Sequence, residues 1–171
     1  QCRRAFSVAR ALWHAVVSRL TRTLGIMKDI TFRVLDEFPE PDYTALVDEA
    51  FSNYLESELL SAVAREEAAA KAVSPAAKIA DALRIGAFRG EKLVGWTYAS
   101  PEGSSLLYMI NSGVTPSERK NGIYSELARL VIEHARARGY VAILSRHAAN
   151  NNAVIIAKLK LGFFVSGFEY S

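Results

Sequence analysis

The segment from Gly113 to Leu127, "GVTPSERKNGIYSEL", combines residue types that can bind phosphate with the start of a helix. An apolar run ends at Val114, and a basic polar loop with one glycine then leads into an amphipathic pattern. A helix start offers unpaired backbone N–H groups and the positive end of the helix dipole. An irregular loop that contains glycine lets such groups converge on a pyrophosphate. Arg119 and Lys120 add positive charge, so the segment is a candidate phosphate-binding loop.

The same segment is also compatible with an ordinary joint between a strand and a helix. It is not a P-loop, because no Gly-Lys-Ser/Thr follows. Nor is it a dinucleotide-binding GxGxxG turn, because the loop holds a single glycine, Gly122. The choice between the two interpretations therefore depends on the elements that position the loop.

Hydrophobic periodicity predicts alternating strands and helices around this loop. In chain order we expect a half-buried strand at 29–35, a helix capped by Asp42, and an Ala/Glu-rich helix from about Ser57 that ends at Val73–Pro75. A short helical piece at 76–83, a hairpin that turns at Arg89–Lys92 and a central strand at 105–114 follow. The remaining predictions are a helix from Ile123 to Gly139, a buried strand at 140–145, a short helix at 151–161 and a last strand at 163–170.

Length and composition favour one globular domain in a reducing compartment. The chain has 171 residues, half of them hydrophobic, and Cys2 is its single cysteine, which excludes an intramolecular disulfide. No apolar run reaches the roughly 20 residues of a membrane span. The formal net charge of +3 is misleading, since residues 1–26 hold five arginines and no acid. Residues 27–171 are close to neutral, so we expect no nucleic-acid partner.

Residues 1–26 form a basic extension that we expect to lie outside the fold. Their Arg-rich, acid-free, amphipathic pattern is typical of a transit peptide or of a helix on a membrane surface. Alternatively, Met27 is the true start and the preceding residues are an upstream extension. In either case residues 27–171 are predicted to be the functional domain.

Three motifs occur in a fixed order along the chain. "VTP" at 114–116 precedes "RKNGIY" at 119–124, Asn151 precedes Gly162-Phe163 across a short helix, and "RGEKLVGW" forms the predicted hairpin. From about Ile30 to Tyr170 the chain thus resembles the GNAT superfamily of acyl-CoA-dependent N-acyltransferases. The resemblance implies a single-domain α/β sandwich whose mixed, mostly antiparallel sheet is flanked by helices. The family's last strand would be lost here, absent because the sequence is truncated, or supplied by a partner chain. An unpaired edge at that place would favour a homodimer.

The resemblance implies acetyl-CoA as co-substrate, no metal, and an expected cytoplasmic enzyme that acetylates a primary amine of a small molecule or peptide. Backbone N–H groups of 119–125 would hold the pyrophosphate, Ser112 to Val114 would pair with the pantetheine arm, and Val114 N–H would polarise the thioester carbonyl. Asn151 would bind pantetheine from the other side. The cofactor-binding set is then Ser112, Val114, Arg119, Lys120, Asn121, Gly122, Ile123, Tyr124, Ser125 and Asn151.

The sequence departs from the family pattern in two places. Tyr124 replaces a small residue, and its bulk would shift the helix start or turn the side chain outward. Lys158 stands where a tyrosine often protonates the leaving thiolate. It would donate a proton or stabilise the charge, or it is a solvated helix lysine.

A general base is not evident in the sequence. Tyr108 occupies the place of a family glutamate and is a poor base, so the proton of the amine would leave through water. Tyr98 and Asn111 would project with Tyr108 from the sheet near the acceptor side, and Glu56 or Glu58 would approach from the helices. His147, after the strand at 140–145, is a candidate base or an exposed loop residue, and His134 is expected to be packed. The missing base and tyrosine leave open a CoA-binding regulatory module without turnover, and the acyl group could differ from acetyl.

Overall fold

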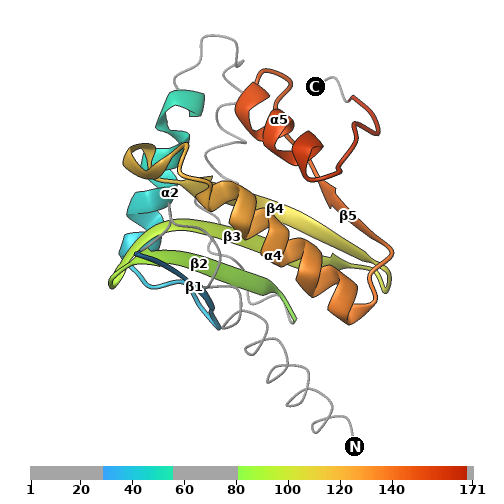
Figure 1. Ribbon diagram of the computed structural model, residues 1–171, viewed down its shortest axis with the longest axis horizontal. Coiled ribbons are helices and arrows are strands. Elements are labelled where there is room, and N and C mark those ends of the chain that lie inside the picture. The colour runs from blue at the N-terminus through green and yellow to red at the C-terminus, as the bar shows by residue number, and fades with distance from the viewer. Residues whose placement is uncertain (1–28, 56–80, 169–171) are drawn as a thin grey trace, which may run out of the picture.

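The computed structural model describes residues 29–55 and 81–168, and the side chains of 51–55 are not described. Five strands form one sheet that α2 covers on one face and α4 on the other (Figure 1). The elements are β1 (Ile30–Val34), α2 (Asp42–Leu55), β2 (Leu83–Arg89), β3 (Lys92–Glu102), β4 (Leu106–Val114), a 3-10 turn η1 (Pro116–Glu118), α4 (Ile123–Arg138), β5 (Ala142–Ser145) and α5 (Asn152–Lys160).

Several expectations lie outside the described residues. These are the basic extension at 1–26, the helix from about Ser57, its break at Val73–Pro75, most of the helical piece at 76–83, and the candidates Glu56 and Glu58.

The strands lie in the order in which they occur along the chain. β1 to β4 are antiparallel to their neighbours, and β5 is parallel to β4. The α4 crossover joins these two parallel strands. The predicted mixed, mostly antiparallel sheet flanked by helices is therefore confirmed.

Each face of the sheet carries its own apolar core. The α4 face buries Leu127, Leu130 and Val131 of the helix against the strands, with exposed fractions of 0 to 1%. The α2 face is aromatic, and there Trp96 and Tyr98 of β3 pack with Phe38. The apolar residues of the amphipathic helix predicted from Ile123 thus face the sheet.

Two local predictions were wrong. Asp42 is the first residue of α2 rather than its cap. The side-chain acceptor at this helix start is Glu40, whose Oε2 accepts hydrogen bonds from Thr44 N–H (3.3 Å) and Thr44 Oγ1–H (2.8 Å). The strand predicted over 163–170 is absent at 163–168, where Phe164 and Phe168 are 83 and 76% exposed.

The absence of that strand explains a third difference. We expected 140–145 to be buried, yet β5 covers only 142–145 and is half-buried, with Val141 83% exposed beside it. Within the described ranges, β5 is an edge strand of the sheet. The side chains of such a strand have a neighbouring strand on one side only, so they stay partly exposed.

Gly113 is required by the ring of Trp96. A Cβ at position 113 would lie 2.4 Å from Trp96 Cη2, far below a normal contact. We expect Gly113→Ala to lower the free energy of unfolding by about 1–3 kcal/mol, the usual effect of overpacking a core. Urea denaturation would measure the change. Gly167→Ala is the matched control because nothing lies within 4 Å of its Cβ position, and equal stability of the two variants would contradict the prediction.

Candidate functional site

β4 separates from β5 halfway along its length. The last pair between them is Met109 with Ser145. On the other side of β4 the register shifts, since Tyr98 faces Asn111 whereas Ala99 faces Met109. Ile110 is therefore an extra residue in β4, and such a bulge bends a strand. No described strand pairs with the β5-facing edge of β4 beyond the bulge.

The backbone N–H groups of Ser112 and Val114 point toward this open edge. Thr115 N–H donates to Val94 O at 2.9 Å, which sets the hydrogen-bonding phase between β3 and β4. In an antiparallel pair the residues alternate between bonding to the partner and pointing away from it. The register pairs Val114 with Gly95 and Ser112 with Thr97, so both N–H groups face away from β3. An extended chain placed along this edge would find donors at both positions.

The phosphate-loop candidate has an unusual backbone. Lys120 and Gly122 both have positive φ, +67° and +83°, and Gly122 is the N-cap of α4. No side chain caps the helix. The first intrahelical bond runs from Glu126 N–H to Gly122 O at 3.0 Å, so the N–H groups of residues 123–125 precede it. The start of α4 therefore presents several backbone donors to an anion.

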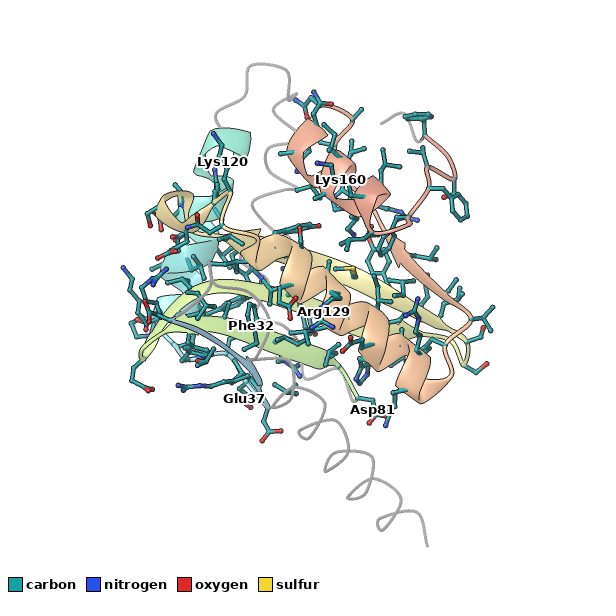
Figure 2. The ribbon with its side chains drawn as sticks, viewed as in Figure 1. Phe32, Glu37, Asp81, Lys120, Arg129 and Lys160 are labelled. Carbon is teal, nitrogen blue, oxygen red and sulfur yellow. The ribbon has the colours of Figure 1, made fainter. Side chains whose placement is uncertain are left out.

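The charged side chains around the loop have different tasks. Arg119 is used internally, since its Nε donates to Val114 O (3.2 Å) and its Nη2 to Ala50 O (3.4 Å). Glu118 is bonded to Arg89 at 2.6 and 2.8 Å, and this guanidinium holds the pKa of Glu118 below its usual range. Lys120 is exposed and projects from the loop (Figure 2). Lys120 is thus placed to meet an incoming anion.

Lys158 is buried, so its interpretation as a solvated helix lysine was wrong. Its side chain is 5% exposed, and Nζ donates to Ser145 Oγ at 2.5 Å and contacts Met109 Sδ at 3.5 Å. These two residues are the last pair before β4 and β5 part, so the amine marks the point of separation. Burial lowers the pKa of Lys158 from 10.5 to about 8. Phe163 lies under the amine at 5.1 Å.

Comparison with known families now decides the class of protein. The acetyltransferase (GNAT) family model matches residues 35–163. The chain belongs to the GNAT family. A search of curated proteins finds no significant match.

Solved structures of GNAT enzymes share the fold of this chain. AAC(6')-Iy in complex with the bisubstrate analogue CoA-S-monomethyl-acetylneamine matches with a TM-score of 0.55 and 13% identity, over 83% of this chain and 95% of that one. An aminoglycoside antibiotic 6'-N-acetyltransferase from Acinetobacter baumannii matches with a TM-score of 0.56, 16% identity and the same two coverages. The ribosomal-protein-S18-alanine N-acetyltransferase from Escherichia coli has a TM-score of 0.58 and 16% identity, over 78 and 76%. At these identities the likeness concerns the fold alone.

Tyr124 of the GNAT motif neither shifts the helix start nor turns outward, which corrects both expectations. α4 begins at Ile123, directly before it, and Tyr124 packs against the core on the α4 face. Its hydroxyl is buried without a hydrogen-bond partner, and burial raises its pKa. The ring is thus part of the packing between α4 and the sheet.

Asn151 is the N-cap residue of α5, yet its side chain makes no capping bond. Its backbone is held by a bond from its own N–H to Ala148 O at 2.9 Å and by one from Ile155 N–H to its carbonyl at 3.1 Å. The residue is half-buried. The side-chain amide of Asn151 is therefore not used to cap α5.

The residues expected on the acceptor side lie in two places: Tyr98 and Asn111 on the α2 face of the sheet, and Tyr108 earlier on β4 where that strand still pairs with β5. Tyr98 and Asn111 form a cross-strand pair on the α2 face, where Asn111 Oδ1 accepts a bond from Trp96 Nε1 (2.8 Å). The hydroxyl of Tyr98 is buried without a partner. Tyr108 is half-buried on β4, opposite Ser100 and Leu144.

The two histidines have low pKa values for related reasons. His134 is half-buried on α4, and burial together with Arg138 lowers its pKa to about 4. His147 follows β5, and partial burial of its ring together with the charge of Lys158 lowers its pKa to about 4, although the residue remains exposed to solvent on one side. His147 also contacts Ser145, a residue that the sequence analysis did not select. Ser145 becomes a candidate site residue because it accepts a hydrogen bond from Lys158, and the spacing of the two residues in the sequence does not predict that contact.

The described residues contain neither a candidate membrane span nor a candidate metal site. In the described part of the chain, no helix is long and apolar enough to cross a membrane. Nor do the described residues contain a group of three His, Cys, Asp or Glu side chains that could hold a metal ion.

Proposed function

We propose that this GNAT protein is an N-acetyltransferase in which a primary amine attacks the carbonyl of acetyl-CoA directly. The observation that carries the proposal is the convergence of three features. The open edge of β4 presents the N–H groups of Ser112 and Val114, the start of α4, without a side-chain cap, lies nine residues after the end of β4, and Lys158 Nζ lies where β4 and β5 part.

Binding of the co-substrate would use mostly main-chain groups. The donors of 119–125 bind the pyrophosphate, with Lys120 adding charge from solvent and Arg119 bracing the loop against β4. Asn121 is exposed in the same loop, and its amide is 3.4 Å from Glu118. Ser112 and Val114 pair with the pantetheine arm, and the amide of Asn151 binds it from the α5 side. Acetyl-CoA supplies the activated acetyl group.

Val114 N–H is the proposed oxyanion donor. Val114 is 7% exposed, and its N–H belongs to the Gly113–Val114 peptide, which the pairing of Gly113 with Trp96 holds in the sheet. A donor held in place before the reaction stabilises developing charge without a reorganisation cost. Catalysis would thus come mainly from positioning and from this fixed donor.

Lys158 is the proposed proton donor to the departing thiolate. A thiol has a pKa of about 8.5, and the pKa of Lys158 is lowered to about 8. A donor and an acceptor with similar proton affinity exchange a proton readily. Tyr108 remains a proposed contact of the reacting groups. Since a neutral phenol is a poor base, the amine proton would leave through water.

Two assays test the proposal. Acetyl-CoA should raise the melting temperature of the protein, and an amine panel should reveal an acceptor through release of free CoA. The panel should hold aminoglycosides, polyamines and peptide amines, because the similar solved structures include enzymes named for aminoglycosides and for a protein alanine. The absence of any thermal shift would refute the co-substrate site. Binding without CoA release from any amine would instead favour a CoA-binding regulatory module.

A second copy of the chain is the proposed partner at the β5 edge. Val141, directly before β5, is 83% exposed. An open edge strand is a ready template for pairing. Sedimentation equilibrium would report a monomer if the proposal is wrong.

A further inference from the structure

We propose that Ser145 and His147 form a proton relay that resupplies Lys158 from solvent after each transfer to the thiolate. The proposal rests on the proposed function of Lys158 as proton donor. Ser145 and His147 act through Lys158, so they are positioning and proton-conducting residues rather than groups that touch the substrate.

Three side chains form a continuous hydrogen-bonded chain from the interior to the surface. Lys158 Nζ is 2.5 Å from Ser145 Oγ, and Ser145 Oγ is 3.2 Å from His147 Nε2. Exposure rises along the chain, since Lys158 is buried, Ser145 half-buried and His147 exposed. A proton can therefore travel between bulk water and the buried amine without movement of the backbone.

The hydrogen-bond donor and acceptor roles of Lys158, Ser145 and His147 are mutually consistent. A charged Lys158 has only donors, so Ser145 Oγ accepts from it. The hydroxyl hydrogen of Ser145 is then directed to His147 Nε2, the other atom within reach. The ammonium group has three N–H donors, of which one is directed to Ser145 Oγ and a second contacts Met109 Sδ, a weak acceptor. The amine thus keeps a donor for the thiolate while it stays connected to the relay.

The charges around Lys158 favour proton movement in the required direction. In the described part of the chain no carboxylate pairs with Lys158, and burial alone lowers its pKa. The pKa of His147 is lowered by burial and by the charge of Lys158. Arg146 separates Ser145 from His147 and is exposed. When Lys158 becomes neutral, its effect on His147 ends, so the imidazole gains proton affinity at the moment when a proton is needed.

The proton count balances over one cycle. The C–S bond breaks, its electron pair stays on sulfur, and one proton passes from Nζ to the thiolate. Nε2 of His147 then takes a proton from water and passes it to Ser145 Oγ as the Ser145 hydroxyl proton moves to the Nζ lone pair. Nδ1 of His147 keeps its proton throughout. The proton that the amine loses on forming the amide returns to solvent. No oxidant or further reactant is required.

Chemical rescue tests the relay in the active enzyme. With an acceptor from the amine panel, His147→Ala should lower kcat about tenfold, less than the roughly 10²–10⁴-fold effect of a group that itself delivers the proton. Added imidazole should restore kcat in this variant, whereas a merely structural loss would not respond to it. Imidazole should not restore Lys158→Met. Full kcat in His147→Ala, or a loss that imidazole leaves unchanged, would overturn the relay.

An NMR titration tests the relay of Lys158, Ser145 and His147 in the absence of an amine substrate. The side-chain NMR signal of ¹³C-labelled Lys158 should show a second inflection near pH 4 from His147, which should vanish in His147→Ala. Ser145→Ala should lower the pKa of Lys158, because the charged amine loses its oxygen acceptor. Lys160, exposed on the same helix, provides an internal reference (Figure 2). A Lys158 titration that neither variant changes would overturn the relay, whereas failure of acetyl-CoA to bind would refute the proposed function alone.

Discussion

Replacing Lys158 by methionine is expected to lower kcat by about 10²–10⁴-fold, the usual contribution of a positioned proton donor. The affinity for acetyl-CoA should change little, because the proposed binding groups lie on β4, on the loop before α4 and at Asn151. In the wild-type enzyme kcat should fall as pH rises through about 8, where Lys158 loses its proton. This falling limb should be absent from the methionine variant. Unchanged turnover would remove Lys158 from the mechanism.

The same variant should be more stable than the wild-type protein. Burial lowers the pKa of Lys158 from 10.5 to about 8, so below pH 8 the fold carries a desolvated charge at a cost of roughly 3 kcal/mol. Between pH 8 and 10.5 the unfolded chain binds more protons than the folded one, so wild-type stability should rise with pH in that window. Methionine has similar bulk and no charge. The stability difference measured by urea unfolding should therefore be largest at or below pH 7 and should shrink above pH 8.

Lys160→Met is the matched control for both effects. Lys160 lies two residues further along α5 with its side chain exposed (Figure 2). The substitution is chemically identical, yet neither kcat nor its pH dependence should change, and no charge is desolvated. Equal gains in stability from the two variants would show that burial of Lys158 is not the cause.

Gly122→Glu is expected to weaken acetyl-CoA binding by about 10²–10⁴-fold. This range corresponds to two hydrogen bonds to charged groups at about 1.5–3 kcal/mol each. The backbone at Gly122 has φ of +83°, which side chains with a Cβ rarely adopt. Nothing lies within 4 Å of its Cβ position, so a glutamate would extend over the start of α4 and compete there with the pyrophosphate. Isothermal titration calorimetry with acetyl-CoA measures the change.

Gly103→Glu separates the site effect from backbone strain. Gly103 also has positive φ, +66°, and open space at its Cβ position. It lies in the turn before β4, at the opposite end of that strand from Val114. Both variants should lose similar stability, and only Gly122→Glu should lose affinity. Equal acetyl-CoA affinity in the two variants would disprove the phosphate-loop assignment.

Much of the fold was predictable because its signals are local. The stripe of α4 repeats every three to four residues, Gly122 and Gly139 bound that helix, and the hairpin turn at 89–92 separates two apolar runs. Each such signal lies within a few residues of the element it specifies. The failures at the cap of α2 and at 163–168 arose where a signal had two readings. Two acids, Glu40 and Asp42, stand near one helix start, and an apolar run forms a strand only if another strand lies beside it.

The sequence by itself determined the order of the elements, the glycine at the start of α4 and the motifs that identify the family, because these depend on spacing along the chain. The tertiary structure decided which residues of the candidate site contact one another and how deeply Lys158 is buried. Lys158 stands 13 residues after Ser145 and 49 after Met109, yet it contacts both where their strands part. Burial, and with it the lowered pKa of Lys158, depends on which distant segments meet. That is why the same lysine reads as a surface residue in the sequence and as a candidate proton donor in the fold.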